Sequence, residues 1–140
     1  MKVLFDTNVV LDQLLEREPH VDSAEQLLSL VDAGRLEGLI CSTTATTIHY
    51  LASKAVGAQA AMEFIRKLLS FLDVACVDRE VLRSALDLGF ADFEDAVIHE
   101  AARLAGAAAI VTRNGRDFAR SELPVFSPAE LLAAVQAESE

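Results

Sequence analysis

The chain opens on a short apolar run that ends at an aspartate, and this opening limits the possible folds more than any other feature. Residues 3–5 form a run typical of a buried strand, which Asp6 stops at once. Thr7 and Asn8 follow with short polar side chains that favour strand ends and helix caps. Apolar residues at helical spacing come next, at Val9, Val10, Leu11, Leu14 and Leu15. The opening therefore predicts a strand that leads directly into a helix and carries a carboxylate at its carboxyl end.

Short apolar runs and amphipathic stretches alternate along the rest of the chain. Further strands are predicted at 39–41, 74–77, 109–111 and 125–126, the last at an edge of the sheet. Helices are predicted at 21–33, at 42–56 with Ser42, Thr43 or Thr44 as the cap, at 58–71, 79–88, 92–104 and 128–136, with a turn or single helical turn over 115–118. This alternation predicts an α/β fold, in which a parallel sheet of about five strands has helices on both faces. Helical spacing also places Met62, Leu69 and Leu104 on buried faces.

Composition indicates a folded, globular protein. The 140 residues, 52% of them hydrophobic, fit one domain over 1–140 whose tail frays from about residue 137. Because no apolar run approaches the roughly 20 residues that span a bilayer, and the start lacks the pattern of a secretory signal, we expect a cytoplasmic protein without a membrane partner. Cys41 and Cys76 are predicted to be buried free thiols.

The chain is strongly acidic, with a net charge of −10. This charge argues against passive binding to phosphate backbones, which requires clustered Lys and Arg. The charge is still compatible with a nuclease function, because bound divalent cations reverse the local charge.

Acidic side chains follow several predicted elements at one edge of the sheet. Asp6 ends the first strand, Asp92 and Asp95 begin a helix, and Asn114 and Asp117 follow the strand at 109–111. The carboxyl edge of a parallel sheet is where ligands bind. Converging carboxylates repel one another, and a hard cation such as Mg²⁺, which prefers oxygen ligands, relieves that repulsion. Each acid also has an ordinary structural explanation, as a helix cap, a first-turn residue or a strand-end turn, and these alternatives stay open.

Four stretches of the sequence resemble PIN domains, the ribonuclease fold of VapC-type toxins. In order they are LFDTNVVLDQLLEREP, ICSTTATTIHYLASK, LGFADFEDAVIHEAARLAG and IVTRNGRDF. Together they extend over nearly the whole chain, from Val3 to about Leu131. The combination of DTN, DFEDA and TRNxxDF is specific, whereas DTN alone also suits phosphatases and receiver domains.

The resemblance implies a PIN-like three-layer fold and a Mg²⁺- or Mn²⁺-dependent endoribonuclease, the toxin of a toxin–antitoxin pair. RNA is the implied substrate, and a small antitoxin and a second copy of the chain are implied partners. The implied catalytic residues are Asp6, Asp95 and Asp117, and the implied metal ligands are Asp6, Asp92, Asp95 and Asp117. Thr7, Asn8 and Asn114 would support the site, and Arg113 and Arg116 are candidate RNA contacts. His99, four residues beyond Asp95, could hydrogen-bond that carboxylate, but a structural role is the favoured interpretation.

The chain departs from the family in the helix predicted at 42–56. Many PIN domains carry a glutamate there, whereas this chain has Thr47 and no acid from Ser42 through Ala60. The alternative is therefore a PIN-fold module that binds RNA or protein without cleaving. A phosphatase with Asp6 as nucleophile is a weaker rival, since it would want a second aspartate where Asn8 stands.

Overall fold

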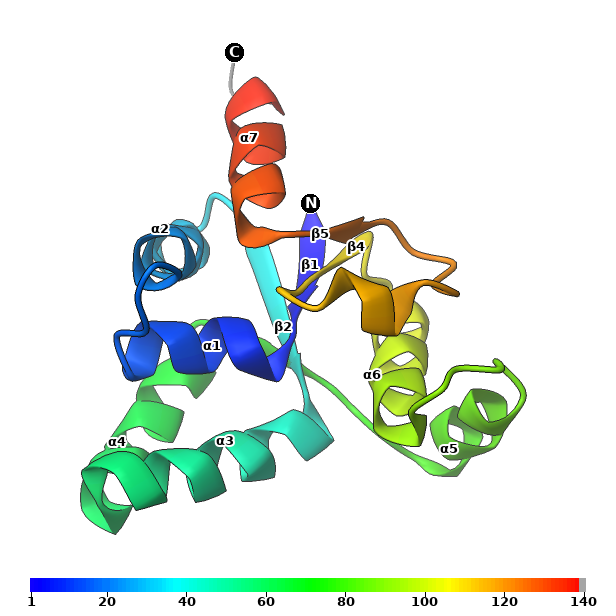
Figure 1. Cartoon of the computed structure of the whole chain (residues 1–140), viewed down its shortest axis with the longest axis horizontal. Helices are drawn as coiled ribbons and strands as arrows, with labels where there is room; N and C mark the ends of the chain where they lie inside the picture. Colours follow the sequence, from blue (N-terminus) through cyan, green and yellow to red (C-terminus); the bar gives the residue numbers. More distant parts are fainter. Residues whose placement is uncertain (139–140) are drawn as a thin grey trace.

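The computed structural model describes residues 1–138 and has a five-stranded sheet at its centre (Figure 1). The strands are β1 (Lys2–Phe5), β2 (Glu37–Cys41), β3 (Asp73–Ala75), β4 (Ala109–Val111) and β5 (Val125–Phe126). They lie in the order β3-β2-β1-β4-β5, and every neighbouring pair is parallel. The predicted parallel sheet of about five strands, with β5 at an edge, is confirmed.

Helices connect the strands. They are α1 (Thr7–Leu14), α2 (Val21–Asp32), α3 (Ser42–Val56), α4 (Ala58–Leu69), α5 (Arg79–Leu86), α6 (Phe93–Leu104) and α7 (Pro128–Glu138), with a 3₁₀ helix η1 (Gly115–Phe118) after β4. Helices α3 and α4 pack together as a hairpin, and Gly57 joins them at a φ of 92°, a backbone conformation that glycine tolerates best. No helix within residues 1–138 has the length and apolar character needed to cross a membrane.

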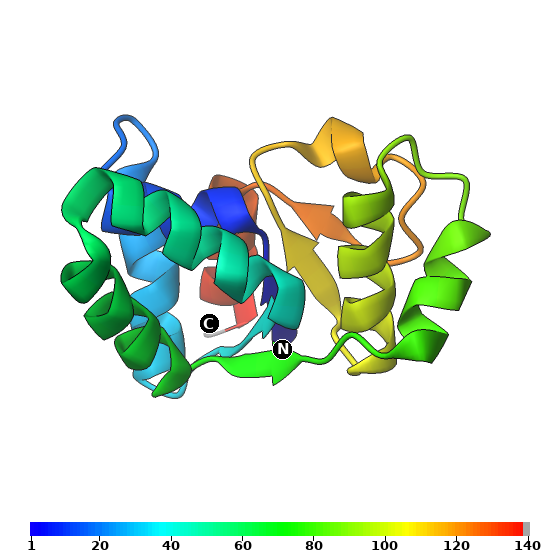
Figure 2. The same cartoon turned by 90° about the horizontal axis from the view of Figure 1, so that it is seen from below.

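Alternate residues of the strands face two separate cores. Val3 and Phe5 of β1 contact a core that includes side chains of α1, α2, α3, α4 and α7, whereas Leu4 faces a second core built with α5 and α6. This alternation is the period of a strand, and it explains why the central strands are apolar on both sides. Figures 1 and 2 show the two helical layers on opposite sides of the sheet, which gives the predicted three-layer fold.

The order in which strands are added to the sheet reverses at the central strand β1. From β1 the chain goes to β2 and then β3 on one side, and it later returns to place β4 and β5 on the other. The backbone N–H of Asp6 donates to the carbonyl of Val111 at 3.0 Å, so the ends of β1 and β4 are level. The point at which the strand order reverses is where open α/β sheets bind ligands.

Several local predictions were wrong. Cys76 is exposed rather than buried, although Cys41 is buried as expected. Met62, Leu69 and Leu104 are also exposed, because only part of the apolar arc of α4 and α6 contacts another element. Helix α7 continues through Glu138, beyond the predicted end at 136, and the expected fraying of residues 139–140 lies outside the described residues.

The start of α3 also differs from the prediction. Cys41 stands at the N-cap position without a side-chain capping bond, and the helix begins at Ser42. The Ser42 hydroxyl instead accepts a hydrogen bond from the Val77 backbone N–H at 3.1 Å, which ties the end of β2 to the chain beyond β3.

Candidate metal site at the sheet edge

Asp6 lies at the reversal point and is held by three neighbours. Its carboxylate accepts hydrogen bonds from the Thr7 backbone N–H at 2.8 Å, the Thr112 hydroxyl at 2.8 Å and the Asn8 side-chain amide at 3.4 Å. The bond from Thr7 makes Asp6 the N-cap of α1. Only 8% of Asp6 is exposed. Its orientation is therefore fixed by β4 on one side and by the start of α1 on the other.

Burial makes the negative form of Asp6 costly. Loss of solvent raises the pKa of its carboxyl above the ordinary value, and the nearby charge of Asp117 adds to that shift. The hydrogen bonds from Thr112 and Thr7 act in the opposite direction. A carboxylate held in this state gains from a cation more than a solvated one does.

Asp95 faces the same group of charges from the first turn of α6. Burial first, and then the charges of Asp92, Asp6 and Asp117, raise the pKa of Asp95 to about 7. No described residue donates a hydrogen bond to its carboxylate or forms an ion pair with it. Asp6 and Asp117 thus act electrostatically on Asp95, and Asp117 also acts on Asp6, although Asp6 follows β1, Asp95 begins α6 and Asp117 lies in η1.

Asp92 has a structural role of its own. Its side chain accepts hydrogen bonds from the backbone N–H groups of Glu94 at 2.8 Å and Asp95 at 3.3 Å, which makes it the N-cap of α6. One oxygen of the carboxylate makes both of these bonds. The other oxygen is not used by the cap, so Asp92 can serve α6 and still face a ligand.

The segment after β4 supplies the remaining predicted residues. Asp117 and Asn114 are exposed, and the backbone N–H of Asp117 donates to the Asn114 carbonyl at 2.9 Å to start η1. The Asn114 backbone N–H donates to the Thr112 hydroxyl at 3.0 Å, the same hydroxyl that bonds Asp6. Helix α6 contacts η1, and Figure 2 shows η1 beside the beginning of α6.

The donor chemistry of this site fits a hard divalent cation. All of the candidate ligands offer carboxylate oxygens, the donors that Mg²⁺ and Mn²⁺ prefer. Within residues 1–138, however, no three acidic, cysteine or histidine side chains come together closely enough to enclose an ion directly. Mg²⁺ commonly keeps several water molecules and contacts only one or two carboxylates, so this spacing suits a hydrated ion.

The Arg113 side chain forms an ion pair within the protein, with Asp12. Its guanidinium donates to both carboxylate oxygens of Asp12, with Nη2 at 3.1 Å from Oδ1, and Asp12 is completely buried in α1. The Arg113 backbone N–H also donates to the Asn8 side chain at 3.2 Å. Arg113 therefore fastens the segment after β4 to α1, whereas Arg116 is exposed and is the better placed of the two predicted RNA contacts.

Asn8 supports Asp6 as the sequence suggested, and Thr47 adds no acid to α3. The Asn8 amide bonds Asp6, the Thr112 hydroxyl and the Arg113 backbone, so it braces the site instead of facing outward. Thr47 is half-buried on α3, and its hydroxyl donates to the Thr43 carbonyl of its own helix at 3.4 Å. Thr47 thus brings no charge to the position where many PIN domains carry a glutamate.

His99 has the structural role that the sequence favoured, and it does not bond Asp95. It is completely buried, with Nδ1 at 3.0 Å from the Glu100 carboxylate and Nε2 at 3.0 Å from the Glu122 backbone nitrogen. Glu100 is also fully buried, and it bonds Arg103 and Ser84 as well. These bonds hold the pKa of Glu100 down at about 2, chiefly through Arg103.

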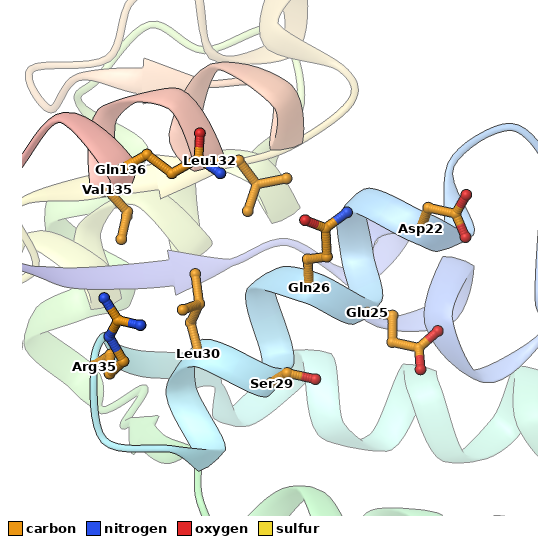
Figure 3. Close-up of a pocket in the computed structure, with 9 residues that line it drawn as sticks. All are labelled: Asp22, Glu25, Gln26, Ser29, Leu30, Arg35, Leu132, Val135 and Gln136. Atoms are coloured by element: carbon orange, nitrogen blue, oxygen red, sulfur yellow. The ribbon is translucent and has the colours of Figure 1, made fainter. Parts of the chain in front are cut away.

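A separate cavity of about 710 Å³ lies between α2 and α7 (Figure 3). Leu30, Leu132 and Val135 point into it, with Asp22 and Glu25 toward one end. None of the acids at the sheet edge lines it, so it is not part of the candidate metal site.

Sequence reasoning missed three residues that organise the site: Thr112, Asp12 and Glu100. Thr112 could have been found from the sequence, because it directly follows the predicted strand at 109–111, which in the structure pairs with β1. Asp12 and Glu100 fall on buried faces of their helices, where a charge is unusual, and their partners Arg113 and Arg103 carry the opposite charge.

An all-parallel sheet with acidic residues near its reversal point defines an α/β domain with a candidate ligand site at the carboxyl edge. A family model described as PIN domain matches residues 2–116. The chain therefore belongs to the PIN domain family, which confirms the resemblance noted in the sequence.

Individual relatives agree with this assignment. Ribonuclease VapC1 of Aquifex aeolicus is 25% identical over 134 residues, which cover 92% of each protein. The structure of VapBC2 from Rickettsia felis bound to a promoter DNA fragment superposes with a TM-score of 0.71 at 20% identity, covering 91% of this chain and 98% of that one. A toxin–antitoxin complex from Klebsiella pneumoniae gives 0.69 at 25% identity, covering 90% and 97%.

Proposed function

We propose that this protein is a divalent-cation-dependent endoribonuclease and the toxin of a toxin–antitoxin pair. The observation that carries the proposal is the placement of Asp6 at the reversal point of the sheet, where Asp6 and Asp117 both act electrostatically on Asp95. The similarity to a VapC ribonuclease supports RNA as the substrate.

Different residues of the chain would have different roles at such a site. Asp6, Asp95 and Asp117 would hold a hydrated Mg²⁺ or Mn²⁺, directly or through its water molecules, with Asp92 contributing its second oxygen. Thr7, Asn8 and Thr112 keep the Asp6 carboxylate in one orientation, and Asn114 begins η1. When bound, the cation lowers the pKa of a water molecule and stabilises the charge that develops on the scissile phosphate. The exposed guanidinium of Arg116 is available to a neighbouring phosphate of the RNA.

A small antitoxin protein is the partner that this proposal requires, because an unrestrained ribonuclease would damage the cell that makes it. Similarity to a solved toxin–antitoxin complex supports such a partner. We also carry forward a homodimer and a cytoplasmic location as parts of the proposal.

A second function rests on Thr47. Without a carboxylate on α3, the site has fewer negative charges with which to bind a cation, so a module that binds RNA or protein without cleaving it is the alternative. Replacing Thr47 by Glu should then increase any cleavage rate, provided that this position faces the acids.

The test is cleavage of a labelled single-stranded RNA by the purified protein, freed of any antitoxin, with Mg²⁺ or Mn²⁺. We expect cleavage that a chelator abolishes and that Asp6→Asn largely removes, since the amide keeps the shape but loses the charge. Asp22→Asn, a change at an exposed position on α2, is the matched control. Binding of RNA without cleavage by either ion, unaffected by Asp6→Asn, would favour the non-cleaving module, and an equally active Asp6→Asn would place the activity elsewhere.

A further inference from the structure

A buried histidine connects two elements of the candidate site. His99 lies one helical turn beyond Asp95 on α6, and no part of it is exposed. One ring nitrogen, Nε2, lies 3.0 Å from the backbone nitrogen of Glu122, and the other, Nδ1, lies 3.0 Å from a Glu100 oxygen. Glu122 belongs to the loop that leaves η1 and enters β5.

These two contacts determine the protonation of the ring. A backbone N–H can only donate, so Nε2 of His99 must be an acceptor and carry no proton. The single proton of the neutral ring therefore resides on Nδ1, from which it is donated to the Glu100 carboxylate. Of the possible forms of the imidazole, only this tautomer satisfies both neighbours.

Glu100 is suited to hold that tautomer. Its carboxylate is fully buried and accepts from Arg103 Nη2 at 2.7 Å, from Arg103 Nε at 3.1 Å and from the Ser84 hydroxyl of α5. Because these donors keep Glu100 negative and immobile, its oxygen remains an acceptor for His99 Nδ1. The result is an ordered series of contacts from Glu100 through His99 to the Glu122 backbone.

The series acts on the segment that carries Asp117. Phe118, the next residue, is buried and packs edge-on against Phe90, with ring centroids 6.1 Å apart, and Phe90 in turn packs on the His99 ring at 5.3 Å. The Ser121 backbone N–H donates to the Phe118 carbonyl at 2.9 Å, so the loop turns back immediately after η1. His99 therefore meets this segment at Glu122 and, through Phe90, at Phe118.

We propose that His99 is a positioning residue for the acidic site: held as the Nδ1–H tautomer by Glu100, it fixes η1 and the following loop, and thereby the place of Asp117 relative to Asp95. Helix α6 then both presents Asp95 and locates the element that presents Asp117. This inference rests on the proposed function only in treating these acids as cation ligands, because the contacts themselves do not depend on it.

A pair of substitutions separates the two roles of the ring. His99→Gln keeps an acceptor near the place of Nε2, whereas His99→Asn keeps a donor near Nδ1 and loses the contact with Glu122. We expect His99→Asn to speed amide hydrogen exchange at residues 114–122 and to weaken Mn²⁺ binding by about tenfold, the smaller loss seen when a residue behind a metal ligand is replaced. His99→Gln should restore most of both.

A change in the loop tests the same contact without altering the core. Glu122→Pro removes the backbone N–H that His99 accepts, and Glu122→Ala, which retains it, is the matched control at this exposed position. We expect weaker Mn²⁺ binding for the proline variant alone. If RNA is cleaved, kcat should fall more than KM rises, because the acids and not the RNA surface have been displaced.

The results that would overturn the inference differ from those that would overturn the proposed function. If His99→Asn and Glu122→Pro remain folded by circular dichroism and bind Mn²⁺ as tightly as the parent, His99 has only a structural role. The same holds if His99→Gln and His99→Asn behave alike. If instead the parent binds Mn²⁺ and the variants show the expected losses, but the parent cleaves no RNA, the positioning role stands and the ribonuclease proposal fails.

Discussion

At the scale of single residues, the surroundings of Asp95 shift the pKa of its carboxyl far above the ordinary value. Burial and then four neighbouring carboxylates raise its pKa to about 7, and no positively charged side chain among residues 1–138 forms an ion pair with it. Asp6 is shifted in the same direction. Acids with raised pKa values that gather in one place are a recurrent feature of functional sites.

This shift predicts how stability depends on pH. In the unfolded chain Asp95 loses its proton near an ordinary pKa of about 3.9, whereas in the folded protein it keeps the proton until about pH 7. Between these values the folded state holds more protons, so the free energy of unfolding should fall as the pH rises. Urea denaturation from pH 4 to 8 measures this, and Asp95→Asn should flatten the decline while Asp22→Asn leaves it unchanged. A parent protein that becomes steadily more stable over this range would contradict the assignment.

The sequence identified the acids but not the residues that orient them. Asp6, Asp95 and Asp117 could be predicted because each follows a strand or begins a helix, and because the resemblance covers their motifs. The roles of Thr112 and of the Asp12–Arg113 pair could not, since they depend on β4 lying beside β1 and on side chains about 100 residues apart in the chain. Spacing along a sequence carries no information about such contacts.

At the scale of the elements, the positions of helices and strands were predictable, and their exposed faces were less so. Helical periodicity shows that α4 has an apolar arc, but it does not show how much of that arc a neighbour covers. In the structure Ala61 and Leu68 are buried, while Met62 and Leu69 are not. The cap of α6 is the clearest success, because Asp92 begins the helix as predicted.

The two roles of Asp92 can be separated by substitution. Asp92→Ala removes the cap and should lower the free energy of unfolding by about 1 kcal/mol, whereas Asp92→Asn keeps a capping oxygen and should cost little. Urea denaturation reports the cap, and Mn²⁺ titration of the Asn variant reports the charge. Weaker Mn²⁺ binding by Asp92→Asn at unchanged stability would assign Asp92 to the metal site. Unchanged binding would leave it as a cap alone.

At the scale of the whole molecule, topology explains why the acids lie at one edge of the sheet. The chain fills one side of β1 before it crosses to the other, so the carboxyl ends of β1 and β4 lie side by side where the strand order reverses. The net charge of −10 does not attract RNA, so under the proposed function a bound cation would link the acidic protein to the phosphate backbone.

The central claim is that Asp6 and Asp95 bind a divalent cation at this edge of the sheet, and calorimetric titration with Mn²⁺ tests it most directly. We expect the parent and Asp22→Asn to bind Mn²⁺ with the same affinity. Asp6→Asn and Asp95→Asn should each bind at least about tenfold more weakly, a loss seen even when residues behind a metal ligand are replaced. Mn²⁺ affinities for Asp6→Asn and Asp95→Asn that equal the parent's would contradict the account.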